Sequence, residues 1–301
     1  MRRGENRWTL PWRRRRPRVA ALTVVRDEAA MLPRWVGYYG AQLGLENLLV
    51  VDDRSSDGST DDLPCRVIRH EGFPEGRFEK ARMALVSRLG AELLRTHDAV
   101  IFTDADEFLL ADPDRYDGLL DFVAARPELD VAAGVGLNVV HHLDHEGPLR
   151  ADEPVLGQRR FAKLVGRMSK PSLKRVDAPW VRASHGIRAP YLPTRELLLV
   201  HLKFADLDLM RHTADLRHAV RVPAGLTDQS SWARSGDELA AGFRAFLDGG
   251  PEVPELDLQL VDPYRLVSER DGVWRARGPR QLRAMAQGPL LRVPMRFHGL
   301  V

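Results

Sequence analysis

The stretch FTDADEFLL, residues 102–110, places three carboxylates directly after an apolar run, AVIF at 99–102. Four consecutive apolar residues that include Val and Ile predict a buried strand. Carboxylates only a few residues apart repel one another and need water, a cation or a proton. The side chains of Asp104, Asp106 and Glu107 therefore need a partner that the strand itself does not supply.

Strands and helices alternate around this stretch. Short runs rich in Val and Leu predict buried strands, and apolar residues at helical spacing predict the helices between them. This alternation predicts an α/β fold with a mostly parallel sheet, right-handed crossovers and flanking helices. The expected elements are strand 18–25, helix 32–43, strand 47–51, strand 66–69, helix 78–96, strand 99–102, helix 119–125, strand 131–140, strand 197–202, helix 205–220 and helix 237–247.

The 301 residues suffice for one large domain or two smaller ones. We predict a disordered basic tail at 1–17, an α/β domain at 18–222, and a helical or irregular extension at 223–301. Cys65 is the only cysteine, which excludes an intrachain disulfide and a multi-cysteine zinc site.

The net charge of +3 is unevenly distributed. Residues 1–18 carry eight Arg and one Glu, so their charge is +7 and the other 283 residues carry −4. An arginine-rich tail with Trp8 and Trp12 can contact an anionic membrane surface or a partner, or it can be a solvated extension. Since no run approaches the roughly 18 to 20 apolar residues of a membrane span, and no signal peptide is recognisable, we expect a cytoplasmic protein, at most peripheral to the membrane, with no specific nucleic-acid partner.

A metal site is one interpretation of the acidic strand end. Asp104 and Asp106 are separated by one residue, so both can reach one hard divalent cation such as Mg²⁺ or Mn²⁺. Such a cation would also bind a diphosphate and stabilise it as a leaving group. The alternative is that one carboxylate caps the following turn and the others are solvated.

Two more polar clusters follow predicted strands. RDE at 26–28 follows the first strand, and VVDDRSSDGSTDD at 50–62 contains the end of the second. The second cluster can hydrogen-bond a base or a ribose, or it can be a turn followed by a capped helix start. Ligands bind at the carboxyl ends of strands in open parallel sheets, so we expect all the acidic clusters at one edge.

In order and spacing, these motifs resemble the glycosyltransferase family 2 pattern of the GT-A fold. The segments are VRDE at 25–28, VDDRSSDGS at 51–59 and DADEFL at 104–109, and the last is most similar to the subgroup in which DxDEF follows a helix rich in Arg and Lys. The resemblance covers roughly residues 18–205. It implies a metal-dependent, inverting hexosyltransferase with Mn²⁺ or Mg²⁺, a UDP- or GDP-sugar as donor, and a glycan or lipid-linked glycan as acceptor.

The resemblance also implies roles for single residues. The third metal ligand of this fold is often a late His, and we prefer His185, which is followed by Gly186, to His201, which lies in an apolar strand. The expected substrate-binding residues are Val25, Arg26, Glu28, Asp52, Asp53, Ser55, Lys80, Asp104 and Lys174, and the expected metal ligands are Asp104, Asp106 and His185 or, alternatively, His201.

The catalytic base stays open, as does the choice between an inverting and a retaining transfer. An inverting transfer needs a carboxylate that accepts the proton of the acceptor hydroxyl, but no Glu-Asp pair stands at the family's usual distance downstream. The candidates are Asp144, Glu153, Asp177 and Asp206. Glu107 has no assigned partner, and an Arg is one option.

Other functions are also compatible with these residues. A nucleotidyltransferase holds Mg²⁺ with carboxylates on a similar sheet, but it typically has a Gly-rich basic loop after the first strand, and VRDEA at 25–29 contains no Gly. A non-catalytic protein that binds a nucleotide, or a membrane surface through its tail, is the other alternative.

Overall fold

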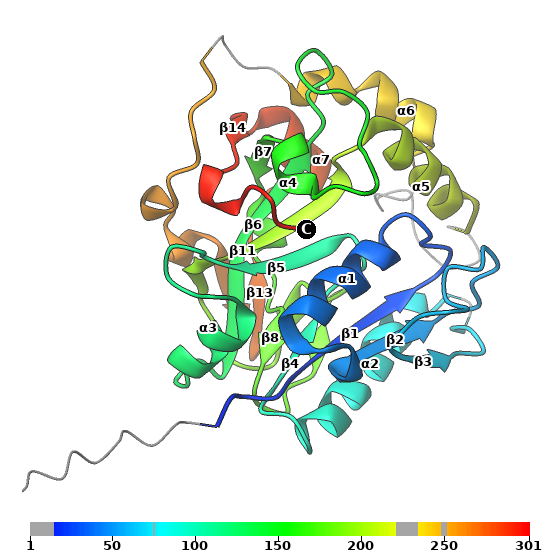
Figure 1. Ribbon diagram of the computed structural model, residues 1–301, viewed down its shortest axis with the longest axis vertical. Coiled ribbons are helices and arrows are strands. Elements are labelled where there is room, and N and C mark those ends of the chain that lie inside the picture. The colour runs from blue at the N-terminus through cyan, green and yellow to red at the C-terminus, as the bar shows by residue number, and fades with distance from the viewer. Residues whose placement is uncertain (1–14, 75, 221–233, 248–251) are drawn as a thin grey trace, which may run out of the picture.

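The computed structural model describes residues 15–74, 76–220, 234–247 and 252–301. Its centre is a large sheet whose strands β3 (Arg66–Arg69), β2 (Leu48–Asp52), β1 (Val19–Val25) and β4 (Ala99–Phe102) are neighbours in that order and run parallel. Helices pack against this sheet (Figure 1). The predicted α/β fold, with a mostly parallel sheet and flanking helices, is confirmed.

The two faces of the sheet are covered by different helices. Side chains alternate along a strand, so Val19 and Ala21 join one apolar cluster while Ala20 and Leu22 join another. The first cluster contains the buried side of α1 (Leu32–Leu43) and of α3 (Leu119–Ala125), and the second contains that of α2 (Phe78–Leu94). α1 and α3 therefore cover one face of the sheet, and α2 covers the other.

FTDADEFLL connects two strands. β4 ends at Phe102, and after a turn β5 (Glu107–Ala111) begins, a strand that the sequence analysis did not predict. β5 pairs antiparallel with β11 (Pro193–Phe204), which runs parallel to β6 (Val131–Val140). In this register His201 faces Glu107 on one side and Asn138 on the other.

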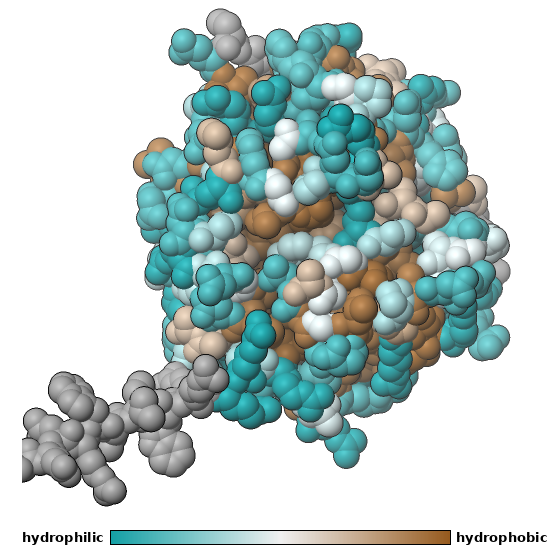
Figure 2. All heavy atoms as spheres, in the orientation of Figure 1, coloured by the Kyte–Doolittle hydropathy of each residue, from teal (hydrophilic) through white to brown (hydrophobic). Residues whose placement is uncertain are grey.

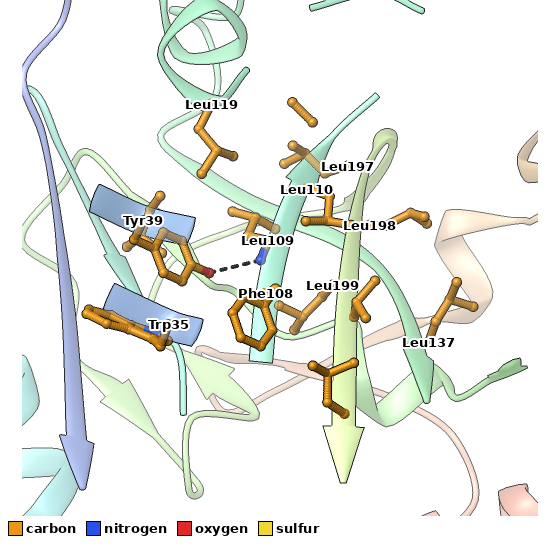
Figure 3. Close-up of a cluster of buried hydrophobic side chains, with 14 of the residues drawn as sticks. Trp35, Tyr39, Phe108, Leu109, Leu110, Leu119, Leu137, Leu197, Leu198 and Leu199 are labelled. Atoms are coloured by element: carbon orange, nitrogen blue, oxygen red, sulfur yellow. Dashed lines mark hydrogen bonds between the residues drawn. The ribbon is translucent and has the colours of Figure 1, made fainter. Parts of the chain in front are cut away.

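Aromatic side chains of α1 hold the turn between β4 and β5 (Figure 3). The indole Nε1 of Trp35 donates to Thr103 Oγ1 at 2.9 Å, before the two aspartates. The hydroxyl of Tyr39 accepts a hydrogen bond from the backbone N–H of Leu109 at 2.9 Å, after them. Phe108 stacks on Tyr39 with ring centroids 6.3 Å apart. The buried side of α1 thus fixes both ends of the acidic turn.

The last fifty residues also form strands that were not predicted. β12 (Val267–Arg270) and β13 (Val273–Ala276) join β9 (Trp180–Val181) and β10 (Gly186–Ile187) in a second, four-stranded sheet. β14 (Leu291–Arg292) pairs with β7 (Phe161–Leu164) at the edge of the main sheet.

The remaining elements are α4 (Val155–Gln158), η2 (Gly166–Met168), β8 (Leu173–Lys174), α5 (Leu207–Val220), α6 (Gly236–Ala241) and α7 (Gln281–Gln287), with short 3-10 turns η1 (Leu45–Asn47), η4 (Phe243–Phe246), η5 (Leu258–Leu260), η6 (Pro263–Arg265) and η7 (Met295–Phe297).

Residues 1–14 of the predicted tail and the predicted boundary between 222 and 223 lie outside the described residues, and the division into domains stays a prediction. In the described part of the chain, no helix is long and apolar enough to cross a membrane. The face in Figure 2 is covered largely by hydrophilic residues, with smaller hydrophobic areas between them.

Candidate functional site

A cavity of about 960 Å³ lies at the carboxyl ends of β1 and β4. It is bounded by the loop after β2, the start of α2, the turn after β4, the β9–β10 turn, β11, α5 and the start of α7. The acidic segments of the sequence analysis meet there. The predicted site residues that line the cavity are Val25, Arg26, Glu28, Asp53, Asp104, Asp106, His185 and His201, whereas Asp52, Ser55, Lys80 and Lys174 do not line it.

Cationic side chains surround Asp104. The guanidinium of Arg82 donates to Asp104 Oδ1 at 2.8 Å, and Lys170 Nζ lies 3.5 Å from Oδ2. Burial alone would raise the pKa of Asp104, but Arg82, Lys170 and Arg217 hold it well below its usual range. Asp104 is therefore ionised and ready to bind a cation or a donor hydrogen.

Asp106 faces an imidazole. His201 Nε2 lies 3.2 Å from Asp106 Oδ2, and the guanidinium of Arg217 lies 3.7 Å from the same oxygen. Burial favours the protonated acid, yet the charges of His201 and Arg217 lower the pKa of Asp106 below its usual range. Its ionised form is thus stabilised by two residues that come from the second half of the chain.

The other ring nitrogen of His201 is held by two amides. Nδ1 lies 2.9 Å from Asn138 Oδ1 and 3.0 Å from Gln281 Nε2. When Nδ1 accepts a hydrogen bond from Gln281 Nε2, Nε2 carries the hydrogen and donates it to Asp106. In the other tautomer Nδ1 donates to Asn138 Oδ1, and the lone pair of Nε2 can share a cation with the carboxylate of Asp106.

The donor set fits a divalent metal ion. Asp106, Glu107 and His201 each offer one ligand atom, and these atoms lie within 4.8 Å of one another. Two carboxylates and one imidazole suit Mn²⁺, because carboxylate oxygens bind hard cations and imidazole binds transition metals. His201, the alternative ligand of the sequence analysis, belongs to this cluster, and His185 does not.

Glu107 pairs with a lysine and not with an arginine. Its carboxylate accepts a hydrogen bond from Lys170 Nζ, and both side chains are buried. Burial raises the pKa of Glu107, as does the charge of Asp104, whereas Lys170 opposes the shift. Lys170 therefore links Glu107 to Asp104 through one ammonium group.

His185 is a neutral imidazole at the wall of the cavity. Its Nδ1 lies 2.7 Å from the backbone oxygen of Arg167, so Nδ1 carries the hydrogen and Nε2 is left as an acceptor. Burial lowers the pKa of His185 to about 3, and the charge of Lys170 acts in the same direction. The residues before it, Arg182, Ala183 and Ser184, have φ values of 57°, 54° and 64°. Three successive left-handed residues are strained, and such strain concentrates at functional sites.

Two lysines assigned to the substrate lie elsewhere. Lys174 is buried, donates to the carbonyl of Ala178 at 2.8 Å, and lies over the ring of Trp180 at 4.1 Å. Lys80 is exposed on α2, and Arg82 faces the cavity in its place. Arg82 shares a helix face with Phe78 at i−4 and Val86 at i+4. A cationic residue on an otherwise apolar stripe was therefore the sequence signal for it.

Asp52, the last residue of β2, and Asp53, directly after it, have different roles. Asp52 accepts from the N–H of Ser55 at 2.8 Å and pairs with Arg69, so it fixes the loop. Ser55 in turn accepts from the N–H of Asp27 at 3.1 Å and joins the loop to the end of β1. Asp53 lines the cavity, and its Oδ1 is buried without a hydrogen-bond partner among the described residues. Asp53 is therefore the one able to accept a hydrogen bond from a ligand.

None of the four predicted base candidates lines the cavity. Asp144 lies 3.4 Å from Arg244, Glu153 pairs with Arg150, and Asp177 is exposed. Asp206 accepts from the N–H groups of the first turn of α5 and lies 3.5 Å from Arg159.

Glu28 has the properties that those four lack. It lines the cavity and lies 3.6 Å from the guanidinium of Arg217. Burial raises the pKa of Glu28 to about 7, with the charges of Asp106 and Asp104 acting in the same direction and Arg217 against it. The sequence analysis placed Glu28 with the substrate-binding residues and did not consider it as a base. Arg217 was not considered at all, because a single Arg on a polar helix resembles a surface residue.

The chain matches no protein-family model and no curated protein sequence. It is similar to a solved mannosyltransferase from Pyrobaculum calidifontis in complex with GDP-Man and Mn²⁺, at 19% identity over 42% of this chain and 36% of that chain, with a TM-score of 0.27. It is also similar to a cytidylyltransferase from Leptospira borgpetersenii, at 10% identity over 45% of this chain and 58% of that chain, with a TM-score of 0.25. Each match is confined to less than half of this chain and to less than two thirds of the other protein.

Proposed function

We propose that this protein is a divalent-metal-dependent glycosyltransferase that transfers a hexosyl group from a UDP- or GDP-sugar to a hydroxyl group of an acceptor. The observation that carries the proposal is the apposition of His201 Nε2 and Asp106 Oδ2 at 3.2 Å in a large cavity. The two groups come from β11 and from the DxD turn after β4, which is where the GT-A pattern of the sequence implies a metal-diphosphate site.

Asp106 and His201 would hold the cation, with Glu107 beside them and Asp104 across the turn. A bound Mn²⁺ or Mg²⁺ would neutralise the developing charge on the leaving diphosphate. Arg82 and Lys170 keep Asp104 ionised, as their distances of 2.8 and 3.5 Å to its oxygens indicate. The positive charges of Arg82 and Lys170 also lower the repulsion between the acidic groups and the phosphates of the donor.

The remaining steps use groups of the chain alone. Oδ1 of Asp53 makes no hydrogen bond among the described residues, although Arg54 Nε lies 3.7 Å away, so it is an acceptor for an N–H or O–H of the nucleoside. The carboxylate of Glu28 is the candidate that takes the proton of the acceptor hydroxyl, because it lines the cavity and belongs to no metal cluster. Loss of that proton as the hydroxyl attacks the anomeric carbon is the expected course of an inverting transfer.

Calorimetric titration with UDP and with GDP, with and without Mn²⁺, tests the proposal. The wild type should bind at least one of the two only with Mn²⁺, and Asp106→Asn should lose that binding. Asp271→Asn is the matched control, since Asp271 is an exposed aspartate whose one ion pair among the described residues is with the exposed Arg270 at 3.4 Å. Absence of metal-dependent binding of either nucleotide to the wild type would refute the proposal, and pyrophosphate release from a nucleoside triphosphate would favour a nucleotidyltransferase.

A further inference from the structure

Lys203 and Arg217 bring two positive charges to the cavity beside the metal-ligand group. Lys203 follows His201 by two residues on β11, Arg217 lies near the end of α5, and both side chains line the cavity. The N–H of Leu202 donates to the carbonyl of Asp106 at 2.8 Å. This hydrogen bond fixes the backbone before Lys203 against the turn that carries Asp106, so less freedom is lost when a ligand binds there.

Lys203 has no carboxylate within ion-pair distance among the described residues. Its Nζ lies 5.7 Å from the ring centroid of Phe204, which is a neutral group. Burial lowers the pKa of Lys203 to about 8, and the charge of Arg217 acts in the same direction, whereas that of Asp106 opposes it. Lys170, the other lysine of the cavity, pairs with two carboxylates. The ammonium group of Lys203 is therefore able to bind an anion that the chain itself does not supply.

Arg217 lies close to the oxygen that would bind the metal ion. Its guanidinium is 3.7 Å from Asp106 Oδ2 and 3.6 Å from the carboxylate of Glu28. The same Oδ2 lies 3.2 Å from His201 Nε2. A divalent cation held by Asp106 and His201 would thus lie near the positive charge of Arg217, and the two would repel each other. An anion that contacts both the metal ion and the guanidinium offsets this repulsion.

The charges that line the cavity also fit an anionic ligand. Among the described residues, eight basic and seven acidic side chains line it. With all of them ionised the excess is one positive charge, and a divalent cation would raise that excess to three. A nucleoside diphosphate carries about three negative charges near neutral pH, since the second pKa of a terminal phosphate is about 6. The metal ion and the diphosphate together would leave the cavity close to neutral.

We infer that Lys203 and Arg217 bind the diphosphate of the donor beside the metal ion, so that the metal ion and the diphosphate strengthen each other's binding. This inference rests on the proposed function, and it names the residues that make its two ligands interdependent. Ammonium and guanidinium groups donate charge-assisted hydrogen bonds to phosphate oxygens that the metal ion leaves free. Because coupling between two ligands is reciprocal, charges that repel the metal ion alone and attract the diphosphate produce cooperative binding. The same contacts stabilise the charge that develops on the leaving diphosphate.

Titrations of Lys203→Met with Mn²⁺ and with inorganic pyrophosphate test the inference. Pyrophosphate is the probe because it carries the diphosphate without a nucleoside. With saturating Mn²⁺, Lys203→Met should bind pyrophosphate about tenfold or more weakly than the wild type. Without pyrophosphate, Lys203→Met should bind Mn²⁺ at least as tightly as the wild type, since a repelling charge has been removed. A misfolded site would instead lower both affinities.

Matched variants serve as controls. Lys80→Met removes an exposed lysine outside the cavity and should equal the wild type in both titrations. Lys203→Arg keeps the charge and should recover most of the pyrophosphate affinity. Arg217→Gln should shift the two affinities in the same directions as Lys203→Met, whereas Arg211→Gln, at an exposed position of the same helix, should shift neither.

Three outcomes would overturn the inference. Pyrophosphate might fail to bind the wild type with Mn²⁺, or it might bind Lys203→Met as tightly as the wild type, so that no ammonium contact exists. Weaker Mn²⁺ binding by Lys203→Met would show that Lys203 supports the metal site instead. The proposed function has its own test in the binding of UDP and GDP with Mn²⁺. If the wild type binds neither nucleotide but binds pyrophosphate through Lys203, the proposed function is refuted and the diphosphate contact is not.

Discussion

Asp106 Oδ2 and His201 Nε2 are 3.2 Å apart although 95 residues separate them in the sequence. The pairing of β5 with β11 and of β11 with β6 produces this contact, because it places His201 between Glu107 and Asn138. Gln281, from the last helix, contacts the far side of the ring at 3.0 Å. The two amides that orient His201 at Nδ1 support the proposed role of its Nε2 as a metal ligand.

His201→Ala should therefore lower the affinity for Mn²⁺ at least tenfold, whereas His185→Ala should have a smaller effect. His201 belongs to the ligand group, while His185 is held by a backbone carbonyl at 2.7 Å and lies outside that group. Calorimetric titration of Mn²⁺ into each variant without nucleotide measures both. The opposite ranking of the two variants would make His185 the third ligand.

The sequence predicts those parts of the fold that depend on local pattern. The bounds of α1 and β4 agree with the prediction, since an apolar period and its flanking turn residues determine each of them. β5 was missed because EFLLA directly follows the DxD turn, and its partner β11 lies about ninety residues away. A strand that is defined by pairing with a distant segment need not show a periodic pattern in its own sequence.

The site was predicted only in part for a similar reason. Asp104 and Asp106 follow a strand end, where ligands gather, so their position was readable. His201 was ranked second because a histidine in an apolar strand resembles a core residue. A polar Asn138 in the otherwise apolar run 131–140 was a usable signal that a polar partner lies opposite. The sequence did not indicate that Gln281 belongs to the site, since the segment around it has no clear helix or strand pattern.

Tyr39→Phe should destabilise the protein by about 1 to 3 kcal/mol, because it leaves the buried N–H of Leu109 without its acceptor. That hydrogen bond, of 2.9 Å, fixes the end of the acidic turn. Urea unfolding followed by circular dichroism measures the free energy of unfolding. Tyr264→Phe is the control, since Tyr264 is 73% exposed and its loss should change stability by less than about 0.5 kcal/mol. Equal stability of the two variants would show that the Tyr39 hydroxyl does not support the turn.

Lys174 should make the free energy of unfolding depend on pH in the alkaline range. Burial lowers the pKa of Lys174 from 10.5 to about 8. Between these values the unfolded chain binds a proton that the folded chain lacks, so the free energy of unfolding rises with pH from about 8 to 10.5. Lys174→Met should remove this part of the rise, and the exposed Lys80→Met should retain it. Urea unfolding at a series of pH values measures the slope, and identical slopes for the two variants would contradict the assignment.

Glu28→Gln tests the candidate base. Burial raises the pKa of Glu28 from 4.5 to about 7, so the carboxylate that accepts a proton forms as the pH rises through 7. The hydrolysis of the donor sugar nucleotide with Mn²⁺ should therefore show kcat/KM rising with pH as Glu28 ionises in the wild type, because water can replace the acceptor hydroxyl. The rise should lie at or below about pH 7, since a bound cation offsets the charges of Asp106 and Asp104. In Glu28→Gln the rate should fall by roughly 100- to 10,000-fold and lose that rise, since the amide cannot take the proton.

Glu153→Gln is the matched control for this experiment. Glu153 was a base candidate from the sequence, but it pairs with Arg150 and does not line the cavity. Its variant should keep both the rate and the pH profile of the wild type. If the pH profile of Glu28→Gln equals that of the wild type, Glu28 is not the base. If kcat/KM of Glu153→Gln no longer rises with pH, Glu153 is the base instead. Nucleotide binding of Glu28→Gln with Mn²⁺, measured in parallel, separates a lost proton acceptor from a lost donor site.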